Sequence, residues 1–345
     1  MNAWDQFKEV ATGGAASRIP VALIVDSPWL PSYAGVDTLD YFLFPELWTR
    51  INLQLLTRFP DVAWIPGFWV EYGMAAEPSA FGAKVVWHHD RPPSIAPVRG
   101  GLAALDGIVP ADPHEDGFMP LALHLYKEAH ARLAAEGAPI RMVAARGPLA
   151  VAGWLLGVSE LMVSLKVERD ATAQLLDALT ETIVRWLRAQ ADAVGGVEGI
   201  LLLDDIPGML SPKLFDAMAA PYLARIFDAF DGLVRVYHND TPCKHLTGHI
   251  GALPFEVWNF SHEMDIAAVQ QEAPGKVLMG NVPPLGILAQ GTPEQVSSWA
   301  RSCIEKTGGS KLILSAGGGV SPGTTSENID ALVLATGAGP GRAVT

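Results

Sequence analysis

Short, continuous hydrophobic runs alternate along the chain with longer stretches in which apolar residues recur at helical spacing. Strands of a parallel sheet are covered on both faces and therefore read as continuous apolar runs. Their alternation with amphipathic segments is typical of βαβ units. The runs are Val21–Val25, Val62–Ile65, Met142–Ala145, Ile200–Leu203, Leu233–Tyr237, Phe255–Phe260, Val277–Met279 and Leu312–Leu314. The pattern therefore predicts a parallel sheet of eight strands.

Helices are predicted between these runs, where apolar residues are spaced three and four positions apart. Several of the segments follow a Ser or Thr, which can accept a hydrogen bond from the first turn of a helix. The predicted helices are Ala171–Ala193, Lys213–Phe230, Pro293–Lys306 and Glu327–Leu334.

Eight strands that alternate with helices favour a closed (β/α)8 TIM barrel over an open doubly wound sheet. No Gly-x-Gly-x-x-Gly motif follows the first strand, which argues against a dinucleotide-binding sheet. The long loop from Gly67 to about Pro120 predicts an insertion after strand 2 that serves as a lid or substrate loop. We expect one barrel over residues 18–336, an N-terminal extension over 1–17 and a disordered Gly-rich tail over 337–345.

The charge of the chain narrows the range of partners. The 345 residues include 24 basic and 37 acidic side chains, a net charge of −13. Such a protein repels phosphate backbones and anionic lipids, so neither nucleic acid nor a membrane is expected as a partner. Two cysteines, no signal-peptide pattern and no apolar run of membrane-spanning length predict a cytoplasmic protein. The sequence carries no signal for a particular oligomeric state.

Polar residues follow most of the predicted strands, at the end where a (β/α)8 barrel carries its active site. Because parallel strand ends meet at one rim, we expect these side chains to converge. Consecutive side chains leave a strand on opposite sides, so one of Asp204 and Asp205 is expected to face the barrel mouth. The candidates are Asp26, Glu71, Glu77, Arg146, Asp204, Asp205, His238, Asp240, Cys243, Asn259, His262 and Asn281.

Some of these residues are of the types that bind zinc. A catalytic zinc takes three protein ligands from imidazole, carboxylate and thiolate groups and keeps one position open. His238, Asp240 or Cys243, and His262 can supply such a set. The spacing matches no common zinc motif, and a single His or Asp at a strand end also fits a purely structural role.

Four segments together resemble the uroporphyrinogen-decarboxylase superfamily. They are Arg146–Gly157, Gly199–Phe227, Gly280–Val296 and Leu312–Val333, and the resemblance extends from about Arg18 to Leu334. It implies a (β/α)8 barrel and one of two activities. One is decarboxylation of uroporphyrinogen; the other is methyl transfer between corrinoid proteins and thiols, amines, ethers or folates, often with zinc.

The chain departs from the decarboxylase pattern implied by this resemblance. Decarboxylases carry an arginine-rich loop after strand 1, whereas no Arg or Lys occurs here from Ile19 to Thr49. Their essential Asp falls near Phe68, their active-site Tyr at Trp154 and their strand-8 His at Gly318. An acidic chain without the arginine clamp has nothing evident to balance a substrate with many carboxylates.

The methyltransferase pattern fits better but is also altered. The His of the His-x-Cys zinc motif matches His238, its Cys falls at Asp240, and the strand-8 Cys falls at Gly318. Carboxylate in place of thiolate makes a zinc site harder, which suits an oxygen-bound or nitrogen-bound methyl group.

The leading hypothesis is therefore a methyltransferase that moves a methyl group between a small O- or N-methyl substrate and cobalamin carried by a partner corrinoid protein. Expected catalytic residues are Asp205, His238, Asp240 and His262, and a possible zinc is assigned to His238, Asp240, Cys243 and His262. Expected substrate-binding residues are Asp26, Trp64, Glu71, Arg146, Trp154, Asn259 and Asn281. The alternatives are a decarboxylase or lyase for a smaller carboxylic acid, with Asp205 as acid/base and Arg146 as carboxylate clamp, or a binding protein without activity.

Overall fold

The computed structural model describes residues 2–25 and 28–337, and its main sheet has eight parallel strands. They are β1 (Val21–Ile24), β2 (Val62–Ile65), β5 (Met142–Arg146), β6 (Gly199–Leu203), β7 (Val234–Asn239), β8 (Val257–Phe260), β9 (Val277–Val282) and β10 (Leu312–Ala316). Their hydrogen-bonded order is β2-β1-β10-β9-β8-β7-β6-β5. Each lies on a predicted run, so the predicted (β/α)8 barrel is confirmed. Asp26 and residues 338–345 of the predicted tail lie outside the described residues.

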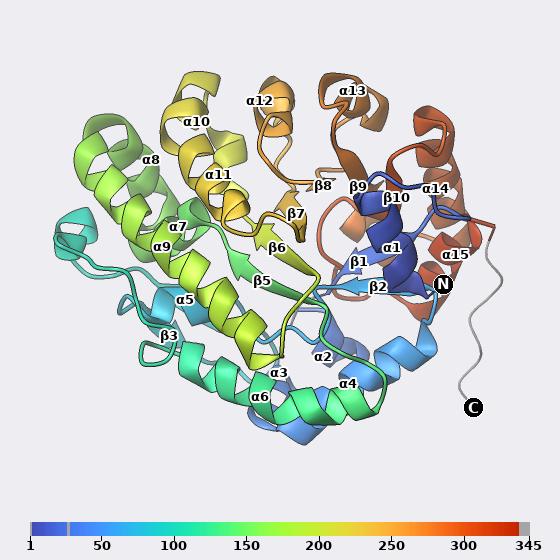
Figure 1. Cartoon of the computed structure of the whole chain (residues 1–345), viewed down its shortest axis with the longest axis horizontal. Helices are drawn as coiled ribbons and strands as arrows, with labels where there is room; N and C mark the ends of the chain where they lie inside the picture. Colours follow the sequence, from blue (N-terminus) through green and yellow to red (C-terminus); the bar gives the residue numbers. More distant parts are fainter. Residues whose placement is uncertain (1, 26–27, 338–345) are drawn as a thin grey trace.

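Helices surround the sheet and cover its outer face (Figure 1). The longer ones are α4 (Pro45–Arg58), α6 (Met119–Ala135), α7 (Pro148–Leu156), α8 (Val158–Val167), α9 (Arg169–Ala193), α11 (Ala220–Asp228), α14 (Pro293–Thr307) and α15 (Ser326–Leu334). The shorter ones are α2 (Leu30–Tyr33), α3 (Thr38–Leu43), α5 (Ala76–Ser79), α10 (Pro212–Met218), α12 (Thr247–Gly251) and α13 (Ile266–Glu272). Among the described residues, no single helix has the length and apolarity of a membrane span, and α7 and α8 pass that test only as a pair bent by 111°.

Three of the four predicted helices are confirmed, and the fourth is divided. Helices α9, α14 and α15 match the predicted ranges to within two residues. The predicted helix over 213–230 is two helices, because α10 ends at Met218 and α11 begins at Ala220. Pro221 lies in the first turn of α11, and a proline there lacks the N–H that would continue the preceding helix.

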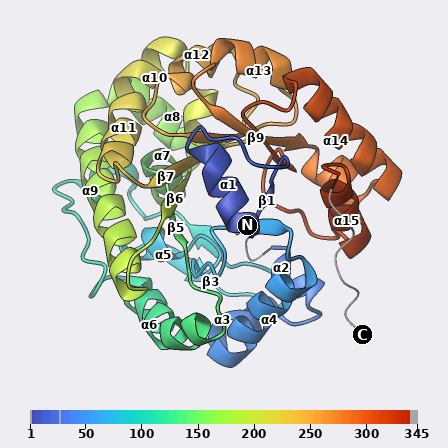
Figure 2. The same ribbon diagram turned by 45° about the vertical axis from the view of Figure 1, so that its right-hand side comes forward.

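The N-terminal segment closes one end of the barrel. Its helix α1 (Ala3–Ala11) lies across the centre of the ring (Figure 2). Trp4 and Phe7 of α1 share a hydrophobic cluster with strand residues such as Leu201, which face the barrel interior. Lys8 pairs at 2.7 Å with Glu198, which directly precedes β6. Because α1 covers the end at which the strands begin, the opposite end, where they finish, is left for a site.

The insertion after β2 helps to complete the barrel wall. Strands β2 and β5 are the two ends of the hydrogen-bonded order, and the insertion carries α5 and the antiparallel hairpin of β3 (Lys84–Val86) and β4 (Ser94–Ala96). Within it, Glu77 Oε1 accepts a hydrogen bond at 2.9 Å from the backbone N–H of Arg146 in β5. A buried backbone donor at a sheet edge needs an acceptor. Glu77 supplies it, and burial raises the pKa of this carboxyl group to about 7.

Candidate active site

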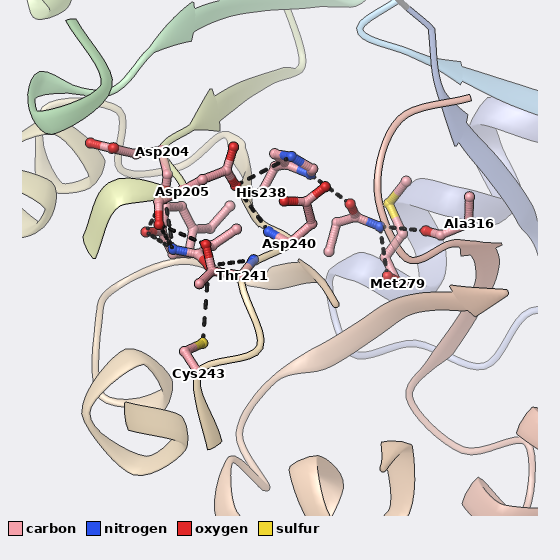
Figure 3. Close-up of polar contacts among 11 residues, drawn as sticks. Asp204, Asp205, His238, Asp240, Thr241, Cys243, Met279 and Ala316 are labelled. Atoms are coloured by element: carbon pink, nitrogen blue, oxygen red, sulfur yellow. Dashed lines mark hydrogen bonds and ion pairs between the residues drawn. The ribbon is translucent and has the colours of Figure 1, made fainter. Parts of the chain in front are cut away.

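Three side chains at the ends of two neighbouring strands meet at the C-terminal end of the barrel (Figure 3). Asp205 follows β6, His238 is the fifth residue of β7, and Asp240 directly follows β7. One ligand atom from each lies within 4.8 Å of the other two. His238 Nε2 is 3.6 Å from Asp205 Oδ1. We call these three residues the acid–histidine cluster.

Hydrogen bonds between the two strand-end turns hold the carboxylates of the acid–histidine cluster in place. The backbone N–H of Asp240 donates to Asp205 Oδ1 at 3.0 Å, and Thr241 Oγ1 donates to the Asp205 carbonyl at 2.8 Å. Asn239 Nδ2 donates to the Asp204 carbonyl at 2.8 Å. These hydrogen bonds join the turn after β7 to the turn after β6. The distance between the two carboxylates is therefore set by the backbone of both turns as well as by the side-chain rotamers.

Asn259, at the end of β8, determines how His238 presents its ring. Its Nδ2 donates to the carbonyls of Met279 (2.8 Å) and Ala316 (2.9 Å), which fixes the orientation of the amide (Figure 3). Its Oδ1 therefore faces His238 Nδ1, at 2.7 Å, and can only accept a hydrogen bond there. The proton of the neutral ring lies on Nδ1, so the Nε2 lone pair is directed to the side of Asp205. Such an imidazole can bind a metal or accept a proton.

The adjacent acid, Asp204, is turned away from the cluster. It is fully buried, and its Oδ2 accepts a hydrogen bond at 3.0 Å from the backbone N–H of Leu149 in the first turn of α7. Burial raises its pKa well above the usual value. Gly147 leaves room for this contact, because a Cβ there would lie 2.3 Å from Asp204 Oδ2. Asp204 thus anchors α7, and Asp205 is the one of the pair that lies with His238.

Asp240 is the member of the acid–histidine cluster that lies toward the turn after β10. Removal of water by the surrounding protein raises the pKa of Asp240, and the carboxylate of Asp205 adds to the rise. His238 and, less strongly, His262 oppose it. A Cβ at Gly318 would lie 2.9 Å from Asp240 Oδ2. Asp240 therefore occupies the space toward the position at which the resemblance implied a third ligand.

A cavity of about 340 Å³ lies beside the acid–histidine cluster and shares Asp205 with it. Trp154 and Arg146, both expected to bind substrate, line its wall. The Arg146 guanidinium is 2.6 Å from Glu71 Oε2, in an almost completely buried ion pair, and lies 4.9 Å from the centre of the Trp69 ring. Glu71 therefore holds Arg146 at the cavity wall and is not itself among the lining residues.

Three other expected residues lie apart from the acid–histidine cluster. Cys243 is fully buried, its thiol is 4.0 Å from Met264 Sδ, and burial raises the pKa of the thiol to about 12. A neutral, enclosed thiol of this kind is a core residue. Trp64 packs between strands and helices, stacked on Trp29 at 5.8 Å. Asn281 donates to the backbone carbonyls of Ser261 and Met264, which fastens the end of β9 to the loop after β8.

His262 is half-buried in that same loop and is not one of the three clustered residues, although its charge reaches Asp240. Met74, Ile95 and Pro97 line the cavity as well, all three from the insertion. The position of the insertion was predictable from the sequence, but no sequence pattern singles out these three residues.

A parallel (β/α)8 barrel with acidic and histidine side chains gathered at its C-terminal rim has the architecture of barrel enzymes. The family model for uroporphyrinogen decarboxylase (URO-D) matches residues 2–338, and the chain belongs to this family. It is 29% identical over 253 residues to the uroporphyrinogen decarboxylase of Synechococcus sp. (strain CC9605), a match that covers 69% of this chain and 68% of that one. It is 32% identical over 169 residues to the uroporphyrinogen decarboxylase of Parasynechococcus marenigrum, covering 47% of this chain and 46% of the relative.

Solved structures show the same fold. A methyltransferase from Methanosarcina mazei superimposes with a TM-score of 0.82 at 22% identity, covering 98% of each chain. A B12-independent methionine synthase from Shewanella sp. gives a TM-score of 0.50 at 14% identity over 74% of each chain. At these identities the likeness establishes the barrel, and the activity has to be argued from the site.

Proposed function

We propose that this protein moves a methyl group between a small O- or N-methylated substrate and a corrinoid held by a partner protein. The observation that carries the proposal is the acid–histidine cluster at the barrel rim, in which the Nε2 lone pair of His238 is directed toward two carboxylates. The fold of the Methanosarcina mazei methyltransferase supports it over the full length of the chain.

The acid–histidine cluster fits a zinc ion of the kind the family's fold implies. Nitrogen and oxygen ligands lie about 2.0–2.2 Å from zinc, so two ligands of a tetrahedral site are about 3.3–3.6 Å apart. The distance of 3.6 Å between His238 Nε2 and Asp205 Oδ1 agrees with this geometry. Asp240 would supply the third ligand. When bound, zinc supplies a Lewis acid that withdraws electrons from the ether oxygen or amine nitrogen, and the corrinoid supplies the nucleophilic cobalt.

The residues of the chain then have separate tasks. His238, Asp205 and Asp240 hold the reacting oxygen or nitrogen at the rim, and Asn259 keeps the His238 ring in place. When the bond between methyl and oxygen or nitrogen breaks, the bonding pair stays with the leaving atom, which must take up a proton. We assign the delivery of this proton to His262, whose charge reaches Asp240.

A decarboxylase is the second candidate, because Arg146 and Asp205 line the same cavity and the curated relatives are uroporphyrinogen decarboxylases. Asp205 would act as acid/base and Arg146 as carboxylate clamp. The clamp is already occupied, since Arg146 is paired with the buried Glu71. Release of CO2 from a small acid without any corrinoid would favour this candidate.

The test combines zinc analysis with turnover. Wild-type protein should contain about one zinc per chain and should change the cobalamin absorption spectrum when a methyl donor is added. His238→Ala should lose both properties. His249→Ala is the matched control, because His249 is a histidine on the exposed α12 that bonds to Asp216. Zinc retained in His238→Ala, or no spectral change with any O- or N-methyl donor, contradicts the proposal.

A further inference from the structure

A second, much smaller cavity is lined by two buried polar groups that lack partners. Trp64 of β2 and Glu71 of the insertion both line it, and each residue is 5% exposed. Trp64 Nε1 and Glu71 Oε1 are shielded from solvent, and neither atom has a hydrogen-bond partner among the residues that the structure describes. Nearly all buried polar groups in folded proteins are hydrogen-bonded, either to protein or to ordered water. Both atoms therefore need a partner, and this cavity is the enclosed space that their side chains share.

The two unpaired atoms are of opposite kinds, which restricts the occupant. An indole N–H can only donate a hydrogen bond, and the oxygen of an ionised carboxylate can only accept one. The other oxygen of Glu71, Oε2, accepts from Arg146 at 2.6 and 3.2 Å in an ion pair. A metal ion cannot accept from Trp64, and an anion such as chloride cannot donate to Glu71. The occupant has to do both, as water does.

The cavity has the size of a single water. About 20 Å³ is open to the centre of a water molecule, and a site needs at least about 10–15 Å³ of such space to hold one. A buried water usually makes about three hydrogen bonds. Asn52 also lines the cavity, and its Nδ2 donates to Tyr41 Oη and to the Trp48 carbonyl at 2.9 Å each. Its Oδ1 is therefore the atom that can accept from a water in the cavity.

We propose that one structural water occupies this cavity, where it accepts from the Trp64 indole N–H and donates to Glu71 Oε1. The site goes beyond the proposed function and does not depend on it. Through Glu71 the water supports Arg146, which lines the wall of the cavity beside the acid–histidine cluster. Burial raises the pKa of Glu71, and the charge of Arg146 opposes the rise. A water that donates to Oε1 also favours the ionised carboxylate, so it helps to keep Arg146 paired and in position.

The first experiment detects the water in the wild-type protein. With ¹⁵N-labelled tryptophan, rotating-frame Overhauser spectra should show a contact between water and the Trp64 indole N–H, and the sign of the signal distinguishes this contact from hydrogen exchange. The matched control is Trp258, whose Nε1 is also buried without a partner among the described residues but which does not line the cavity. We expect no water contact at Trp258. No water contact at Trp64 overturns the proposal.

A crystal structure tests the same site by position. It should show electron density for one water within about 2.7–3.2 Å of both Trp64 Nε1 and Glu71 Oε1. A cavity without density, or density that contacts only one of the two atoms, overturns the proposal.

The second experiment fills the cavity and measures Glu71. Val25 lines the cavity, and Val25→Ile adds one methyl group to a space that holds one water. This variant should lose the water contact at Trp64 and raise the pH midpoint of Glu71, followed by ¹³C nuclear magnetic resonance, by on the order of one pH unit. The matched control is Val21→Ile, the same change at a buried β1 position that does not line the cavity, and it should alter neither signal.

The two readouts together decide whether the water supports Glu71. A water contact that persists in Val25→Ile with an unchanged Glu71 midpoint overturns the proposal, whereas loss of the contact with a raised midpoint supports it. If Val25→Ile does not fold, the measurements on the wild-type protein decide the question, because they need no substitution.

Discussion

Removal of the Asn259 amide should change the tautomer of His238 although no residue of the acid–histidine cluster is itself substituted. In the wild-type protein Asn259 accepts from His238 Nδ1 at 2.7 Å and donates to two backbone carbonyls at 2.8 and 2.9 Å. Asn259→Leu keeps the volume and deletes all three hydrogen bonds. Each of the three buried groups left unpaired costs about 1–3 kcal/mol, so the free energy of unfolding should fall by on the order of 3–9 kcal/mol. Loss of such a support for a metal-binding histidine typically weakens zinc binding about 10- to 100-fold, or about 1.4–2.7 kcal/mol.

Asn259→Asp tests the orientation of the amide directly. One carboxylate oxygen still accepts from His238 Nδ1, but the other faces the carbonyls of Met279 and Ala316 and needs a proton to bond with them. The folded variant therefore holds a proton that the unfolded chain releases above about pH 3.9. A folded-state pKa raised in this way means that stability is lost as pH rises. Relative to wild type, Asn259→Asp should be less stable at pH 8 than at pH 5, by about 1.4 kcal/mol for each unit of pKa difference spanned.

Nuclear magnetic resonance of ¹⁵N-labelled histidine reads the ring state without any metal. Wild-type His238 should show a protonated Nδ1 and an unprotonated Nε2, with the signals assigned by their absence in His238→Gln. Asn259→Leu should show a mixture of both tautomers. An unprotonated Nδ1 in the wild type, or an Asn259→Asp variant whose relative stability does not fall with pH, would show that the amide is oriented the other way.

Three further predictions concern carboxyl groups and the glycines that some of them contact. Burial raises the pKa of Glu77 from 4.5 to about 7. The free energy of unfolding of the wild type should therefore fall by up to about 3 kcal/mol as the pH rises between these two values. Glu77→Gln should abolish this part of the pH dependence in urea unfolding. Gly147→Ala should cost about 2–4 kcal/mol in the same assay, because its Cβ would lie 2.3 Å from Asp204 Oδ2; a loss below about 1 kcal/mol contradicts the packing described. Gly318→Ala should weaken zinc binding at least about tenfold in a chelator competition, because its Cβ would press on Asp240 Oδ2 at 2.9 Å; unchanged affinity would contradict the expected displacement of a ligand carboxylate.

The strands were predictable because each is buried on both faces. Runs such as Ile200–Leu203 and Val277–Met279 can be read from apolar residues alone, and the structure places β6 and β9 there. The break between α10 and α11 was missed because the apolar spacing continues across Pro221, although the proline itself was a usable signal. Sequence reasoning could not predict that Glu77 accepts a hydrogen bond from the backbone of β5. This role arises because β5 is one of the two edge strands of the sheet, and the sequence does not show which strands those are.

The acid–histidine cluster was largely predictable from the shared rim. Asp205, His238 and Asp240 end neighbouring strands, and parallel strands bring such ends together. The sequence did not reveal that Asn259 uses both amide protons on the backbone of β9 and β10. That role requires carbonyls 20 and 57 residues further along the chain, which only the curved sheet brings within reach. Cys243 shows the opposite error. Its thiol is of a kind that binds metals, but the fold buries it in the hydrophobic core.

The chain departs from the family's zinc pattern at Asp240 and at Gly318, and these two positions are in spatial contact. The resemblance implied a cysteine at each position. An aspartate reaches one atom further from the backbone than a cysteine, and its Oδ2 here lies 2.9 Å from where any Cβ at position 318 would be. Atoms of neighbouring side chains do not pack that closely without a hydrogen bond. With the Asp240 carboxylate in this position there is no room for a side chain at 318, so the third potential ligand of the acid–histidine cluster comes from Asp205, which follows β6, instead of from the turn after β10.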